Sequence, residues 1–293
     1  MQIVFHLGVH CTDDGRLIRS ILRSRTALLE RPVHVPGPRS YRSLLRETLG
    51  ILNGAVASDE VQSLLLDALT DDDESERILL FHENLICLPQ RIVSENGLYA
   101  MAPRRIQAIA NLFPGHQCEF HMALCNPAAL IPSLVQRGVA ESYDAVMGAA
   151  TTANQRWLPT IRKIVEANRS INLTLWCNED APLVWPQILR RVCALPDDGT
   201  LEGDIDMAAA LMSDPGATSL RDSLAADPPG SPEAWAARVS AALEEHGRAE
   251  ELAMPVDLPG WTDEVVADLT ETYEADCAAI ATMPGVRFLS PPG

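Results

Sequence analysis

With 293 residues, 47% of them hydrophobic, the chain is long enough to bury a substantial core, and its formal net charge of -17 excludes nucleic acid and anionic membranes as partners. No run of about eighteen apolar residues occurs, and the N-terminus lacks the features of a signal peptide. Seven cysteines without a regular pairing pattern are typical of a reducing compartment. We therefore expect a cytoplasmic protein whose partner is an unknown small molecule or another protein.

The first elements are a strand over residues 2–7, a loop over 8–15 and a helix that begins near Arg16. A loop between a strand and a helix binds phosphate when it has glycines, which let backbone N–H groups close on the anion, and a cation, usually lysine. Here Cys11 stands at the cation position and an Asp-Asp pair follows it. Lys163, the only lysine, lies in a predicted helix far along the chain, so it does not replace the missing cation.

This segment resembles the start of a sulfotransferase domain, whose first strand and loop read His-Ile-Gly-x-x-Lys-Thr-Gly-Thr-Thr-x-Leu. The family binds the 5′-phosphosulfate of 3′-phosphoadenosine 5′-phosphosulfate there. The residues that match in register are His6, Leu7, Gly8, Thr12 and Leu17, whereas the Lys, Gly and two Thr positions hold Cys11, Asp13, Asp14 and Gly15. The resemblance implies that any cofactor would contact Gly8, His10, Cys11 and Thr12.

The helix expected over residues 16–30 has apolar residues at helical spacing and an arginine stripe, Arg16, Arg19 and Arg23. The stripe is either a solvated face or, at Arg16 in the first turn, a replacement for the phosphate cation. Residues 31–38 predict a short, proline-bounded edge strand, and helices follow over 39–52 and 58–69.

Residues 77–85 form a continuous apolar run that ends in polar residues, which is typical of a central parallel strand buried on both faces. Ligands of open α/β sheets bind beyond the carboxyl ends of such strands. His82 and Glu83 are therefore the catalytic candidates, and some sulfotransferases use an acid near this place as the general base. The alternative role for Glu83 is a helix cap or an ion pair with an arginine.

A helix over residues 103–113 precedes a strand over 117–124, and a further helix begins after Asn126. In the sulfotransferases this strand ends in Arg-x-Pro, with a serine eight residues beyond the arginine, and both the arginine and the serine bind the 3′-phosphate. Pro127 and Ser133 are in register with that pattern, but Cys125 occupies the arginine position. The resemblance thus implies a second phosphate motif that has lost its charge.

Zinc binding is one hypothesis for the cysteines and histidines in and beside this strand. They are His116, Cys118, His121 and Cys125. Strand side chains alternate between the two faces of a sheet, so these residues do not converge on one tetrahedral site. We expect no metal.

Residues 142–169 predict a helix, 171–177 a strand and 181–195 another helix, and the chain beyond 196 predicts helices only. Alternating strands and helices imply a parallel sheet with right-handed crossovers. The expected fold is a three-layer α/β domain with a mainly parallel sheet, similar to sulfotransferases and other P-loop proteins, over residues 1–195. An all-helical extension over 196–293 packs on this core.

Three functions fit the sequence. The first is a non-catalytic, sulfotransferase-like domain that binds a ligand or partner and no cofactor. A carboxylate about 4 Å from a phosphate disfavours binding of that phosphate by about 1 to 4 kcal/mol. The carboxylate of Asp13 or Asp14 would then cap the following helix. The second is an active sulfotransferase that holds its cofactor with Arg16 and backbone amides, with Glu83 or His82 as base and a hydroxyl acceptor. The third uses Cys11 as a nucleophile at the helix N-terminus, although the adjacent aspartates raise the thiol pKa.

Overall fold

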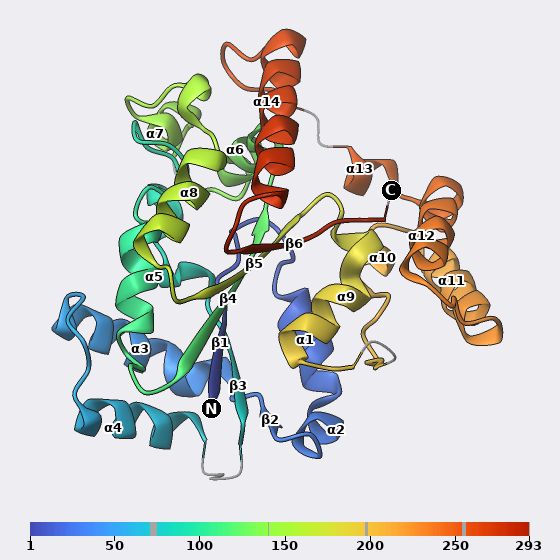
Figure 1. Ribbon diagram of the computed structural model, residues 1–293. Helices are drawn as coiled ribbons and strands as arrows, with labels where there is room; N and C mark the ends of the chain where they lie inside the picture. Colours follow the sequence, from blue (N-terminus) through green and yellow to red (C-terminus); the bar gives the residue numbers. More distant parts are fainter. Residues whose placement is uncertain (71–74, 140, 197–198, 254–255, 293) are drawn as a thin grey trace.

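The computed structural model describes residues 1–70, 75–139, 141–196, 199–253 and 256–292 (Figure 1). Within them six parallel strands form one sheet in the order β2-β3-β1-β4-β5-β6. The strands are β1 (Gln2–His6), β2 (Val33–His34), β3 (Arg77–Phe81), β4 (Gln117–Leu124), β5 (Asn172–Cys177) and β6 (Val286–Leu289). The prediction of a parallel α/β sheet with its first strand in the interior is confirmed.

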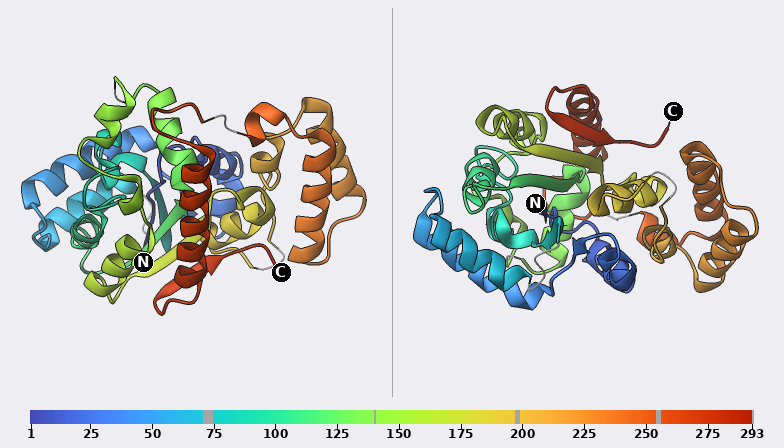
Figure 2. Two further views of the ribbon diagram at one scale, coloured as in Figure 1. Left: turned by 90° about the horizontal axis from the view of Figure 1, so that it is seen from above. Right: turned by 60° about the horizontal axis from the view of Figure 1, so that its bottom comes forward.

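Helices cover both faces of the sheet (Figure 2). One face carries α1 (Arg16–Arg23), α2 (Arg25–Leu29), α9 (Ala181–Cys193) and α10 (Asp206–Ala209). The other carries α3 (Pro38–Leu52), α4 (Asp59–Leu69), α5 (Ala102–Ala110), α6 (Pro127–Gln136), α7 (Tyr143–Met147), α8 (Leu158–Ala167) and α14 (Asp263–Ala281). Helices α11 (Asp214–Ala226) and α12 (Pro232–His246) lie outside α9, and the short α13 (Ala249–Leu252) follows them.

Alternation of side chains along β1 explains why a continuous apolar run is needed here. Ile3 and Phe5 enter the core beneath α3 to α8, whereas Val4 enters the core beneath α1 and α9. Phe5 stacks on Phe120 of β4 with ring centroids 5.4 Å apart. Because both faces are covered, every position of the strand favours an apolar residue.

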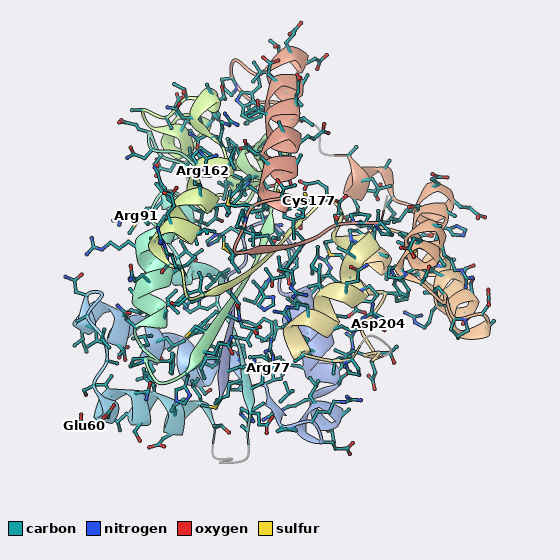
Figure 3. All side chains as sticks on the ribbon, in the orientation of Figure 1. Glu60, Arg77, Arg91, Arg162, Cys177 and Asp204 are labelled. Carbon is teal, nitrogen blue, oxygen red and sulfur yellow. The ribbon has the colours of Figure 1, made fainter. Side chains whose placement is uncertain are left out.

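The face beneath α9 also holds a buried polar network. The Arg77 guanidinium donates from Nη2 to Glu119 Oε2 at 2.7 Å and from Nε to the Val192 carbonyl at 2.9 Å, so it joins β3, β4 and the end of α9 (Figure 3). His121 Nε2 lies 3.5 Å from the same carboxylate oxygen. Burial raises the pKa of Glu119, but the approach of His121 and the hydrogen bond and charge of Arg77 outweigh it and lower this pKa to about 2.

The expectation of an all-helical C-terminal extension is wrong. After α14 the chain turns at Gly285, whose φ is +84°, and residues 286–289 pair in parallel with β5 as an edge strand. Four residues give too short a pattern to distinguish a strand from a tail. The sheet thus includes strands from both expected regions of the chain, 1–195 and 196–293.

Two expected helices are interrupted. The helix over residues 16–30 breaks at Ser24 into α1 and α2, and the helix over 142–169 divides into α7 and α8 around the short 3₁₀ turn Thr152–Asn154. The edge strand expected over 31–38 is reduced to β2, two residues long. No helix among the described residues is long and apolar enough to cross a membrane.

Candidate functional site

A cavity of about 410 Å³ lies beyond the carboxyl ends of β1 and β3, a volume within the range of small-molecule sites. The loop at residues 8–15 lines it together with side chains from α3, from the segment after β3 and from the end of α6. From β1 the chain continues to helices on one face of the sheet, whereas from β3 and β4 it continues to helices on the other. Such a change of direction opens the crevice in which α/β proteins bind ligands.

Gly8 brings the loop against the segment after β3. Its φ is +88°, a conformation that side chains rarely adopt, and a Cβ atom there would lie 3.3 Å from the Glu83 Cβ. The Gly8 carbonyl accepts a hydrogen bond from the Ala123 amide at 2.9 Å, which extends the pairing of β1 with β4. The loop and Glu83 therefore share one cavity, as the motif register predicts.

Asp13 occupies the N-terminus of α1 with its own carboxylate. Its Oδ2 accepts a hydrogen bond from the Leu17 amide at 2.8 Å, and its carbonyl accepts one from the Arg16 amide at 2.9 Å. The expectation that an aspartate of this loop caps the following helix is confirmed. A negative group thus already satisfies the amide and the helix dipole that would otherwise attract a phosphate.

Asp14 forms a bidentate ion pair across the mouth of the cavity. Arg137, just beyond α6, donates from Nη1 to Oδ1 at 2.5 Å and from Nη2 to Oδ2 at 3.2 Å. Both side chains are half-exposed, so the ion pair adds little to the free energy of unfolding, and its main effect is to hold the loop against the end of α6. The sequence pattern does not single out Arg137, whose only signal is its position one turn after Ser133.

Glu83 is held by two donors. Arg42 of α3 donates from Nη2 to its Oε2 at 3.1 Å, and Asn84 Nδ2 donates to its Oε1 at 3.3 Å. Arg42 is itself fixed, because its Nε donates to the Phe81 carbonyl at 3.0 Å. Pairing with an arginine is the alternative role considered for Glu83, and the structure contains that pair.

His10 is a buried part of the scaffold that has no ring nitrogen available to a ligand. The Tyr99 hydroxyl accepts from the His10 amide at 3.0 Å and lies 2.9 Å from its Nδ1, while Nε2 lies 3.0 Å from Asn84 Oδ1. The consistent arrangement has Tyr99 donating to Nδ1 and Nε2–H donating to Asn84. Burial lowers the pKa of His10, so the ring is neutral. Tyr99 in turn stacks on Trp157 at 5.4 Å.

The two other candidate reactive groups are poorly activated. Burial, followed by the charge of Arg42, lowers the pKa of His82 to about 4, which makes it a weak base at neutral pH. Burial raises the pKa of the Cys11 thiol, and Asp14 raises it further against the opposing effect of Arg137. Both side chains line the cavity, and Cys11 has a left-handed backbone with φ +60°.

Two sequence-predicted residues lie outside the cavity lining. Arg16 points back along the loop: its Nη1 donates to the Asp13 carbonyl at 3.2 Å and lies 3.8 Å from Asp14 Oδ2. Ser133 is buried in α6 and does not line the cavity, although its neighbours Leu134 and Arg137 do. Thr12 does line it, with its hydroxyl donating to the Val9 carbonyl at 2.7 Å. Arg16, the candidate cation, and Ser133, the candidate 3′-phosphate ligand, thus both lie outside the cavity lining.

No protein-family model matches the chain, and no curated protein sequence matches it. The function is therefore inferred from the geometry of the cavity. Its described lining includes three carboxylates, Asp13, Asp14 and Glu83, and two guanidinium groups, Arg42 and Arg137. Each of these cations is paired with a carboxylate of the same lining.

Proposed function

We propose that the chain is a sulfotransferase-like domain of the P-loop type that has lost nucleotide binding and acts as a non-catalytic binding domain. The observation that carries this proposal is the Asp13 carboxylate on the Leu17 amide, because it places negative charge where the related loop would hold a phosphate. The central position of β1 and the loop that joins it to α1 support the resemblance in fold. The ligand is a small polar molecule that is neutral or positively charged.

The charge distribution supports this ligand class. The Asp13 carboxylate has no ion pair with an arginine among the described residues, so the described lining carries more negative than positive charge. A phosphosulfate would have to displace Asp14 from Arg137 or Glu83 from Arg42, and would then lie close to the released carboxylates. Each such contact costs about 1 to 4 kcal/mol at about 4 Å.

Calorimetry with 3′-phosphoadenosine 5′-phosphate tests the loss of nucleotide binding. We expect no measurable binding in the cavity after β1 of the natural chain at ordinary salt, and recovered affinity there in the double variant Cys11→Lys, Asp13→Gly, which restores the cation and removes the carboxylate. Asp59→Gly, at the start of α4 and outside the cavity, is the control for the charge change at a helix N-terminus. Micromolar affinity, about 8 kcal/mol, that is lost in Arg137→Ala or Arg42→Ala contradicts the proposal, because both arginines line this cavity.

Sulfuryl transfer to a hydroxyl acceptor is the second candidate, and the shared cavity of Glu83 and the loop favours it. In that reaction Glu83 would take the acceptor proton after Arg42 moves away from its carboxylate. A transfer assay with 3′-phosphoadenosine 5′-phosphosulfate and a panel of alcohols and phenols tests it. Turnover that is lost in Glu83→Gln, while the variant keeps its thermal midpoint, would establish the enzyme and refute a purely binding role.

A further inference from the structure

A second cavity, of about 790 Å³, lies on the face of the sheet that carries α9, and it shares no lining residue with the candidate site. The end of α9, the start of α12 and β6 surround it. Three arginines line it: Arg190 and Arg191 from α9 and Arg287 from β6. No carboxylate lines it among the described residues, which leave out positions 197 and 198.

Arg191 and Arg287 of this cavity repel each other. Burial lowers the pKa of Arg191, the charge of Glu119 opposes this shift, and the charges of Arg287 and Arg77 add to it. Two acids among the described residues act on them: Glu119 Oε1 lies 3.9 Å from Arg191 Nη2, and the charge of Arg190 opposes the burial-induced rise in the pKa of Asp204. Glu119 already accepts the 2.7 Å hydrogen bond from Arg77, so its charge is shared. Within the described part of this chain of net charge -17, the lining of the cavity thus carries more positive than negative charge.

Two buried donors in the same cavity have no acceptor among the described residues. They are Arg191 Nε and the indole Nε1 of Trp235, on the first turn of α12. Buried donors are almost always hydrogen-bonded in proteins. Each of these two nitrogen atoms is covered by protein, so its side chain must turn toward the cavity before it can meet an acceptor there. The Ser231 hydroxyl beside them accepts from the Ala234 amide at 3.2 Å and caps the helix.

We propose that this cavity binds an organic phosphate. Guanidinium groups hold phosphate oxygens through paired hydrogen bonds, and three of them match an anion with more than one charge. Pro186, Pro229 and Leu289 provide an apolar wall for the body of the ligand, and the Trp235 indole adds a donor at its edge. This site is independent of the cavity after β1 and does not rest on the function proposed there.

Calorimetry with inorganic pyrophosphate and with adenosine 5′-diphosphate tests the proposal on the full chain. We expect both to bind, the nucleotide more tightly because it also contacts the apolar wall. Arg190→Ala and Arg287→Ala should each weaken binding about tenfold, the loss expected for one charge-assisted contact. Trp235→Phe, which keeps an aromatic ring and removes the N–H, should weaken it severalfold and should remove the fluorescence change that accompanies binding.

Two controls locate the binding. Arg221→Ala makes the same charge change on the exposed side of α11 and should leave affinity unchanged. Arg137→Ala, in the cavity after β1, should also leave it unchanged. Absence of saturable binding, or binding that persists in the double variant Arg190→Ala, Arg287→Ala with an unchanged thermal midpoint, would overturn the proposal. Equal affinity for pyrophosphate and the nucleotide would contradict the role given to the apolar wall.

Discussion

The Tyr99 hydroxyl fixes the loop after β1 through a single atom that contacts both the amide and the ring of His10. Tyr99→Phe leaves that buried amide and Nδ1 without partners, which should lower the free energy of unfolding by about 1 to 3 kcal/mol. Tyr143→Phe is the matched control, since its hydroxyl accepts one bond from Trp261 at a partly exposed position. Urea denaturation of the two variants measures the difference, and equal losses would show that Tyr99 has no special structural role.

A buried histidine gives the protein a defined sensitivity to acid. Burial lowers the pKa of His121 from 6.5 to about 4, so between these values the unfolded chain binds a proton that the folded chain does not. The free energy of unfolding is therefore independent of this group above pH 6.5. It falls as the pH drops from 6.5 toward 4, by about 1.4 kcal/mol per pH unit for this group. Denaturation curves at several pH values should show a shallower slope in His121→Gln. An unchanged slope would mean that His121 is not the titrating group.

Ala194 ends α9 in a left-handed conformation, with φ +52°. Because glycine adopts this conformation without a Cβ clash, Ala194→Gly should raise the free energy of unfolding by about 1 kcal/mol. Ala237→Gly, an exposed position in the middle of α12, should lower it by a similar amount. Destabilisation in both variants would show that the end of α9 is not strained.

The strands of the sheet could be predicted because helices cover both faces, so β1, β3, β4 and β5 are mostly apolar and buried along their length. Elements of two to four residues, such as β2 and β6, leave no comparable period in the sequence. Within the cavity the loop and Glu83 could be placed by motif register. Arg42, Tyr99 and Arg137 could not, because they come from elements far apart in sequence. Arg42 and Arg137 reach the cavity, and Tyr99 reaches His10 of the loop, only through packing.

The charge of the whole molecule predicts how salt affects it. With a net charge of -17, repulsion between carboxylates favours the expanded chain, and ions screen that repulsion. The thermal midpoint should therefore rise by a few degrees between low salt and about 0.5 M sodium chloride. A midpoint that falls with salt would mean that attractive pairs such as Arg77 with Glu119 outweigh the repulsion.

Both borders of the sheet are formed by its shortest strands, β2 with two residues and β6 with four. A border strand presents unpaired backbone groups that can recruit a strand from another molecule. Here each border offers only a short stretch of such groups, and β6 adds the charge of Arg287. The long apolar strands, which would aggregate most readily, are held in the interior, so the fold itself protects concentrated solutions against intermolecular β-pairing.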